Sequence, residues 1–270
     1  MEFWQNIYSN FDPIAFNLGP IAVHWYGLMY ALALLSAIFV AKWFIKNDKL
    51  TISNDLFDSY IWWAEIGVIL GARLGYVLFY DTHTMYYLTH PWQIFNPYIN
   101  GVYAGISGMS YHGAFFGFII ASYLFCKRNK ISFWFITDIA VLGISAAYVF
   151  GRIGNFYNQE LVGRITDVPW GIYVGQTLRH PSQIYEAILE GLIVFVILVF
   201  LRKRKTFDGQ LALMYGILYS IARIIAEFYR EPDTQLGFIY SNWLTMGILQ
   251  SLIVLGTCVI ILINKRKMNS

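Results

Sequence analysis

The sequence predicts an all-α polytopic membrane protein with seven transmembrane helices, an outward (periplasmic or extracellular) N-terminus and a cytoplasmic C-terminus. Of its 270 residues, only 13% are charged and 57% are apolar, whereas a typical soluble domain has roughly 25% charged residues. A chain so poor in charge cannot cover a surface that faces water. Seven apolar stretches also approach the length that about 30 Å of hydrocarbon requires. The stretches are residues 20–44, 59–80, 107–126, 133–152, 182–201, 209–228 and 242–263.

The distribution of lysine and arginine predicts the orientation of these stretches. Thirteen of the nineteen basic residues, including every lysine, form four clusters in every second connection and in the C-terminal tail. Cytoplasmic connections are enriched in Lys and Arg, so we expect the clusters inside and the other connections outside. The clusters are residues 42–49, 127–130, 202–205 and 265–267. The outward connections are residues 81–106, 153–181 (a small region between spans four and five) and 229–241 of a single membrane domain, residues 1–270.

The six basic residues outside those clusters are all arginines. Orientation alone would not exclude lysine so completely from the outward side. Arginine stays charged when it is desolvated, and its planar fork matches phosphate or carboxylate. The separation of lysines in the clusters from arginines elsewhere therefore favours recognition of an anion. The six are Arg73, Arg152, Arg164, Arg179, Arg223 and Arg230.

Five predicted spans place a polar residue at a similar depth. A helix rises about 1.5 Å per residue, so counting from the nearest cytoplasmic marker puts each residue roughly 21 to 24 Å from the cytoplasmic end. Arg152 and Asn155 lie slightly further out. The shared depth predicts one polar chamber just beneath the outer headgroups. The five residues are Tyr26, Arg73, His112, Glu186 and Arg223.

Structural ion pairs between helices are the alternative explanation for these residues. Glu186 and Glu190 lie four residues apart, so they share a helix face, as do Arg223 and Glu227. Ionisable residues inside a membrane are costly and often functional. Their convergence at one depth favours a functional site.

The segment Gly151–Arg164 is the densest in polar groups. Its glycines allow a close approach of the backbone, and its side chains supply donors and acceptors that suit a phosphate. A glycine-containing turn that ends a helix among solvated residues is the simpler alternative. The polar residues are Arg152, Asn155, Asn158, Glu160 and Arg164.

His112 follows the segment Gly108–Tyr111 at the outward end of the third span. A neutral imidazole at that depth is a suitable proton acceptor, although a single histidine is often only a hydrogen-bonded structural residue. The sequence has no HExxH motif or close His/Cys cluster, so we expect no metal. Cys126 and Cys258 lie far apart in apolar runs, and we expect no disulfide between them.

Six sequence segments, spread over nearly the whole chain, match the motifs of one protein family and follow one another in the same order as in that family. They are HWYGLMY (24–30), GARLGY (71–76), SYHG (110–113), GRIGNFYNQELVGR (151–164), RHPSQIYE (179–186) and RIIAEFYREPD (223–233). Together they resemble the bacterial prolipoprotein diacylglyceryl transferase family. The chain departs from the family pattern at Ala114, where glycine is common, and in a short stretch between Arg164 and Arg179.

The resemblance implies a reaction, a location and partners. Such enzymes transfer the diacylglyceryl group of phosphatidylglycerol to the lipobox cysteine of a preprolipoprotein signal peptide and release glycerol phosphate. The chain would then be a multi-pass protein of the bacterial cytoplasmic (inner) membrane that contacts membrane lipid. No cofactor and no nucleic acid are expected.

The resemblance also implies roles for particular residues. His112 would remove the proton of the incoming thiol or hold the phospholipid headgroup, and the motif does not distinguish the two roles. Arg152 and Arg223 would stabilise the charge on the departing glycerol phosphate. The residues expected to bind or orient the substrate are Tyr26, Arg73, Asn155, Asn158, Glu160, Gly163, His180, Tyr219 and Glu227.

Two other function classes compete with this interpretation. A seven-span transporter or receptor for an anionic ligand would also place arginines in the membrane, but the short glycine–arginine echoes around Arg73 and Arg152 are too brief to form an inverted repeat. Another phospholipid-dependent transferase would use the same phosphate chemistry.

Overall fold

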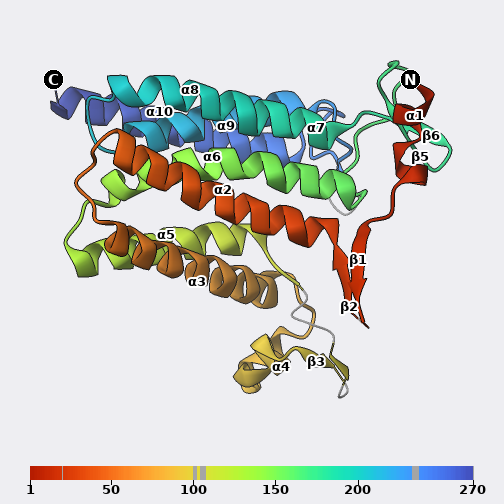
Figure 1. Cartoon of the computed structure of the whole chain (residues 1–270), viewed down its shortest axis with the longest axis horizontal. Coiled ribbons are helices and arrows are strands. Elements are labelled where there is room, and N and C mark those ends of the chain that lie inside the picture. Colours follow the sequence, from red (N-terminus) through yellow and green to blue (C-terminus); the bar gives the residue numbers. More distant parts are fainter. Residues whose placement is uncertain (20, 100–101, 104–107, 233–236, 270) are drawn as a thin grey trace. The chain divides into compact units, whose positions relative to one another are not determined.

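The computed structural model describes residues 1–19, 21–99, 102–103, 108–232 and 237–269 (Figure 1). The chain divides into two compact units. Unit 1 comprises Met1–Lys49 with Thr137–Ser270, and unit 2 comprises Leu50–Ile136. The single membrane domain expected from the sequence stays a prediction.

Seven long helical runs occupy the seven apolar stretches among the described residues. They are α2 (Trp25–Asn47), α3 (Asn54–Phe79), α5 (Tyr111–Asn129), α6 (Phe133–Tyr157), the run formed by α7 (Ser182–Glu186), η3 (Ala187–Ile193) and α8 (Val194–Leu201), α9 (Gln210–Glu227) and α10 (Met246–Asn269). Five of the runs, all but α5 and α9, are long and apolar enough to cross a membrane. The chain is therefore a mostly helical protein of the polytopic membrane type.

Short elements connect the long helices. Three antiparallel hairpins are present in the described part of the chain, so "all-α" is correct only for the long elements. The hairpins are β1 (Ile14–Leu18) with β2 (Ile21–His24), β3 (Tyr98–Ile99) with β4 (Val102–Tyr103), and β5 (Ile172–Val174) with β6 (Thr177–Arg179). The short helices are α1 (Glu2–Gln5), η1 (Ile7–Asn10), α4 (Thr84–Thr89), η2 (Pro91–Phe95) and η4 (Arg202–Arg204).

The end of α6 corrects the predicted end of the fourth span. We expected the span to end at residue 152, with a glycine-containing turn as the simpler alternative for the segment that follows, but the helix continues to Tyr157. It ends where Gln159 takes a left-handed conformation with φ of 57°. The Glu160 amide then donates to the Asn155 carbonyl and the Gln159 amide to that of Phe156, the bond pattern of a Schellman motif. Arg152 and Asn155 consequently sit on rigid helix.

Three predicted spans begin four or five residues later than expected, and the last of them is the seventh, since α10 starts at Met246 and not at residue 242. Residue 20, the expected start of the first span, lies outside the described residues, and strand β2 precedes the start of α2 at Trp25. Residue 107, the expected start of the third span, also lies outside them. Helix α5 starts at Tyr111, because the Ser110 hydroxyl accepts a hydrogen bond from the Gly113 amide and caps the helix. The predicted connections 81–106 and 229–241 also include undescribed residues, at 100–101, 104–107 and 233–236.

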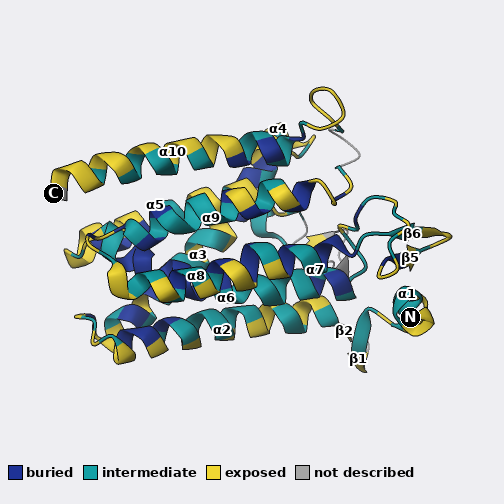
Figure 2. Ribbon diagram, turned by 90° about the horizontal axis from the view of Figure 1, so that it is seen from above, coloured by how far each residue is buried: buried dark blue, intermediate teal, exposed yellow. Residues whose placement is uncertain are grey.

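The helices of unit 1 lie side by side around an apolar core (Figures 1 and 2). Helix α9 contacts α8, η3 and α10, and Gly143 of α6 lies against the backbone of Ala37 in α2. The buried core residues are Phe44, Val141, Leu142, Val194, Leu198, Leu211 and Ala222. Between membrane-spanning helices such packing stabilises through van der Waals contact and not through removal from water, because lipid tails are as apolar as leucine.

The segment between α6 and α7 is ordered by the N-terminal residues of the chain. Tyr8, Phe156 and Ile172 form a small buried cluster, and the Trp4 indole donates to the Trp170 carbonyl at 2.8 Å. The predicted small region between spans four and five is therefore a packed element of unit 1 that includes the β5–β6 hairpin.

The fifth run contains a π-helix, η3, between α7 and α8. A π-helix bonds each residue to the fifth along the chain, is rare, and is frequent at functional sites. Glu190 lies within it.

Unit 2 is built on a close contact between α3 and α5. Gly71 and Gly75 of α3 face Gly113 and Gly117 of α5, and a Cβ atom added to Gly113 would lie 2.2 Å from the Gly71 carbonyl oxygen. Small residues four apart let two helix backbones approach in this way. Because His112 precedes Gly113, this contact fixes the position of His112 within unit 2.

Candidate active site

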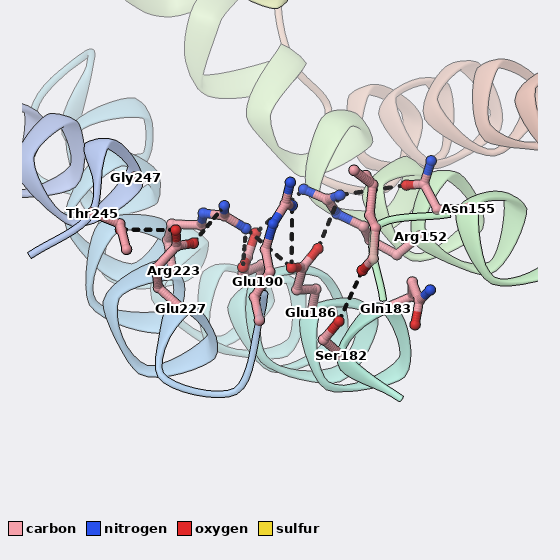
Figure 3. A network of polar contacts seen from close by, with 12 residues as sticks. Arg152, Asn155, Ser182, Gln183, Glu186, Glu190, Arg223, Glu227, Thr245 and Gly247 are labelled. Atoms are coloured by element: carbon pink, nitrogen blue, oxygen red, sulfur yellow. Dashed lines mark hydrogen bonds and ion pairs between the residues drawn. The ribbon is translucent and has the colours of Figure 1, made fainter. Parts of the chain in front are cut away.

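Two arginines of unit 1 share one buried glutamate (Figure 3). Arg152 lies near the end of α6, Arg223 lies in α9, and Glu186 is the last residue of α7. Glu186 Oε2 lies 2.9 Å from Arg152 Nη1, and its Oε1 lies 3.1 Å from Arg223 Nη1. The Glu186 side chain is 0% exposed, whereas those of Arg152 and Arg223 are 15% and 12% exposed. A ligand could therefore reach the arginines but not the carboxylate.

Glu190 is the second fully buried carboxylate of this group. Its Oε1 lies 3.5 Å from Arg223 Nη1 and its Oε2 lies 4.0 Å from Arg152 Nη2. The Tyr148 hydroxyl donates a hydrogen bond to Glu190 and accepts one from Arg152 Nε at 2.8 Å. The Tyr219 hydroxyl lies 3.4 Å from that of Tyr148. This tyrosine pair joins α6 to α9 beside the arginines.

Glu227 holds the other edge of Arg223. Its Oε2 lies 2.6 Å from Arg223 Nη2, and its Oε1 accepts a hydrogen bond of 2.8 Å from the Thr245 hydroxyl. A Cβ atom added to Gly247 would lie 2.8 to 2.9 Å from the Glu227 carboxylate. The start of α10 therefore closes tightly over this carboxylate.

Arg230 is a third cation at Glu186. Its Nη1 lies 3.5 Å from Glu186 Oε1. Arg164, by contrast, donates to the carbonyls of Arg230 and Glu227 at 2.9 and 3.2 Å. Arg164 thus ties the chain after α6 to the end of α9.

A chain of amides extends from Arg152 to Glu160. Arg152 Nη1 lies 3.4 Å from Asn155 Oδ1, and Asn155 Nδ2 donates to Glu160 Oε1 at 2.6 Å. Asn158 Nδ2 donates to the other Glu160 oxygen at 3.0 Å. Tyr26 lies beside this helix end, since a Cβ atom added to Gly154 would be 3.3 Å from its ring. The predicted residues Tyr26, Asn155, Asn158 and Glu160 therefore gather around Arg152.

Gly163 and His180 meet at the edge of this group. The Gly163 amide donates to the His180 carbonyl at 3.0 Å, and a Cβ atom added to Gly163 would lie 2.4 Å from that oxygen. His180 Nδ1 lies 3.1 Å from the Tyr185 hydroxyl. Burial lowers the pKa of His180, although the nearby charge of Asp167 opposes the shift.

His112 and Arg73 lie in unit 2, and each has partners there. His112 Nδ1 lies 3.2 Å from the Tyr80 hydroxyl at the end of α3. Arg73 is buried, and its guanidinium donates to the carbonyls of Ile94 and Gly108 at 2.5 and 3.2 Å. Arg73 therefore anchors the backbone before α5. Its expected contact with substrate stays a prediction.

Comparison with known proteins decides the family. A family model described as prolipoprotein diacylglyceryl transferase matches residues 13–264. The chain belongs to this family. A phosphatidylglycerol--prolipoprotein diacylglyceryl transferase from Aliarcobacter butzleri (strain RM4018) is 85% identical, with 99% of this chain and 98% of that protein covered. Proteins of the same name from Campylobacter jejuni (strain 81-176) and Campylobacter lari are each 58% identical, covering 97% and 94% of this chain and 97% and 93% of their own lengths.

In this member of the prolipoprotein diacylglyceryl transferase family, the structure adds several residues to the site that had no role in the sequence analysis. Glu186 was one of the five residues placed at the depth of the predicted polar chamber, and Glu190 shares its helix face, but neither was given a role at the site. Tyr148 and Thr245 gave no signal, because tyrosine and threonine are common in apolar helices. Arg230 was visible only as one of six arginines outside the basic clusters.

The arrangement suits the chemistry of a diacylglyceryl transferase. Two partly exposed guanidiniums are held by buried carboxylates and a tyrosine, so they are fixed before substrate binds. Preorganised cations stabilise charge that develops on a leaving group better than mobile water does. Among the described residues, no group of His, Cys, Asp and Glu could hold a metal ion.

Proposed function

We propose that this chain transfers the diacylglyceryl group of phosphatidylglycerol to the thiol of a lipobox cysteine and releases glycerol phosphate. This is the first step of bacterial lipoprotein maturation, and relatives up to 85% identical are named for the transfer to prolipoproteins. The observation that supports it most directly is the pair Arg152 and Arg223, held from both sides of Glu186. That pair suits the phosphate of an anionic lipid.

In the proposed step, the cysteine sulfur forms a bond to the glyceryl carbon as the bond between that carbon and the phosphate oxygen breaks. The electron pair stays on glycerol phosphate, which gains negative charge. Arg152 and Arg223 would stabilise that charge. The thiol proton must go to a base, because the thiolate is the reactive nucleophile.

His112 is our candidate for that base. Its imidazole is suited to accept a proton at neutral pH, and Tyr80 lies within hydrogen-bond distance of Nδ1. An Nδ1–H bond to the Tyr80 oxygen would leave Nε2 as the acceptor. The competing role for His112 is to position the headgroup, and the two roles predict different dependence on pH.

The proposed membrane arrangement has seven spans, an outward N-terminus and a site near the outer headgroups of the bacterial inner membrane. All lysines fall in alternate connections and the C-terminal tail, which supports this orientation. The acceptor would be the signal peptide of a preprolipoprotein that carries a lipobox cysteine.

Mass spectrometry of a lipobox peptide tests the function. The purified protein is incubated with the peptide and phosphatidylglycerol, and a peptide in which serine replaces the cysteine is the control. We expect a mass gain equal to one diacylglyceryl group on the cysteine peptide alone, with release of glycerol phosphate. The same gain on the serine peptide, or no gain on the cysteine peptide, would contradict the proposal.

A further inference from the structure

The arginines that would bind the lipid phosphate already have several protein partners. The Tyr148 hydroxyl accepts hydrogen bonds from both Nε and Nη2 of Arg152, while Nη1 faces Glu186. Arg223 directs Nη1 at Glu186 and Glu190, and Nη2 at Glu227. A phosphate must therefore join a site that already contains anions.

The positive and negative charges of the described ion pairs balance before a lipid binds. Arg152 and Arg223 contact three carboxylates, and Arg230 adds a third cation at Glu186. The phosphodiester of phosphatidylglycerol would bring a fourth negative charge to three positive ones. An uncompensated charge in a buried site is expensive, and a buried carboxylate usually neutralises instead. Uptake of one proton would restore the balance.

Glu190 is the carboxylate least strongly held by cations. Its contacts with arginine are 3.5 and 4.0 Å long. Glu186 has contacts of 2.9 and 3.1 Å, and Glu227 has one of 2.6 Å. Coulomb energy falls with distance, so the ionised form of Glu190 gains least from its neighbours. Its side chain is also fully buried.

The groups around Glu190 can accommodate a proton. Tyr148 and Arg152 face it from α6, Arg223 from α9 and Glu186 from α7, while α8 consists only of apolar residues. Tyr148 now donates to Glu190. A proton on Glu190 Oε1, which takes part in no hydrogen bond among the described residues, would let Tyr148 keep donating to Glu190 Oε2.

We propose that Glu190 takes up one proton from solvent when the phosphate of an anionic phospholipid binds at Arg152 and Arg223. The carboxylate becomes a neutral carboxylic acid, and no bond to the lipid forms or breaks. This inference rests on the proposed function in assuming that phosphatidylglycerol binds at these arginines. It makes Glu190 a positioning residue whose charge state is linked to lipid binding.

Linkage sets the sign and size of the effect. If binding takes up one proton, the association constant falls up to about tenfold for each unit of pH above the pKa of Glu190 in the lipid-free protein. Glutamine at position 190 imitates the protonated acid, so lipid binding to Glu190→Gln should lose this dependence.

Calorimetric titration measures the proton directly. Short-chain phosphatidylglycerol is titrated into the full-length protein in detergent, in two buffers of different ionisation enthalpy at the same pH. Wild type should take up as much as one proton per lipid, and Glu190→Gln should take up none. Glu231→Gln is the matched control, because Glu231 pairs with Arg179 outside the arginine site, and it should behave as wild type. No uptake in wild type, or equal uptake in Glu190→Gln, would overturn the proposal.

Infrared difference spectroscopy keeps the test decisive if Glu190→Gln fails to fold. Binding of phosphatidylglycerol to wild type should produce the C=O band of a protonated carboxylic acid, which differs from the lipid ester bands because it shifts in deuterated water. Tyr148→Phe retains every carboxylate but removes the hydrogen-bond partner of Glu190, so the band should shift in frequency. An absent or unshifted band would overturn the proposal.

The peptide assay separates this proposal from the proposed function. Proton uptake without a diacylglyceryl product would contradict the function and leave the linkage intact. Product formation without proton uptake would contradict the linkage alone.

Discussion

Glu186 lies between Arg152 and Arg223 and presents one carboxylate oxygen to each, at 2.9 and 3.1 Å. The three residues come from α7, α6 and α9, so one buried side chain sets the relative position of two cations from different helices. Removing one member of a buried ion pair typically costs about 3 to 5 kcal/mol, because the partner's charge is left without compensation. The arginine pair is therefore a single structural unit.

Arg152→Lys and Arg223→Lys should each reduce turnover at least about tenfold while leaving inserted protein. Lysine keeps the charge, but its single nitrogen cannot reproduce a planar fork. Arg152 donates from both Nε and Nη2 to the Tyr148 hydroxyl and directs Nη1 at Glu186. Steady-state rates with a lipobox peptide measure the effect, and Arg266→Lys in the last turn of α10 is the control. Wild-type rates in both lysine variants would refute the proposed role.

His112→Gln should slow turnover about 10²- to 10⁴-fold at neutral pH if His112 is the base. Raising the pH should then recover part of the rate, because more of the substrate cysteine is already thiolate. Lipid affinity should change little. A pH–rate profile parallel to that of wild type, together with weaker phosphatidylglycerol binding, would show that His112 only positions the headgroup.

Gly113→Ala should destabilise unit 2 strongly. The added methyl would lie 2.2 Å from the Gly71 carbonyl oxygen, so α3 and α5 would have to separate. Gly256→Ala in α10 is the matched control, since nothing lies within 4 Å of a Cβ atom there and alanine has the higher helix propensity by about 1 kcal/mol. Thermal unfolding in detergent should show a lower midpoint for the first variant only. Equal midpoints would contradict the described packing.

Acidification should weaken the packing around His180. Burial lowers its pKa in the folded chain, so the unfolded chain binds a proton at higher pH than the folded one. The contribution of neutral His180 to stability is then complete above its unfolded pKa of about 6.5 and declines as the pH falls below that value. Unfolding midpoints measured from pH 7.5 downward should decline more steeply in wild type than in His180→Gln. Identical slopes would refute this linkage.

Cysteine labelling tests the proposed topology. Met85→Cys and Arg204→Cys are introduced separately into a chain in which Cys126 and Cys258 are replaced by alanine. An impermeant maleimide added to intact cells or spheroplasts should label position 85 and not position 204, because 204 belongs to a basic cluster. Labelling at 204 from outside would contradict the orientation.

The long helices were predictable because apolar length is a property of the sequence alone. The gathering of Arg152, Asn155 and Glu160 was also predictable, since they lie close in the chain and at one depth. The extension of α6 was not. A non-glycine residue, Gln159, adopts the left-handed conformation that ends it, and its residue type gives no such signal.

The roles of Glu186 and Glu190 required the structure for a different reason. Hydropathy averages over a span, and two carboxylates hardly change the average of the run from Ser182 to Arg204. Only the packing of α6 and α9 shows that both carboxylates face arginines. The backbone contacts of Arg73 also required the structure, because its depth in the sequence gave no indication of the Ile94 and Gly108 carbonyls; its contact with substrate stays a prediction.

Because it contains the π-helix η3, the fifth run is sensitive to a change of one residue in its length. Deleting one apolar residue between Ala187 and Ile193 would let the segment relax to an ordinary α-helix and would still leave enough hydrocarbon-compatible length. A π-turn accommodates about one extra residue, so Glu186 would keep nearly its present orientation relative to α8, whereas residues inside η3, including Glu190, would change position. Such a deletion would escape any hydropathy profile, yet it would change how Glu190 faces Arg152 and Arg223.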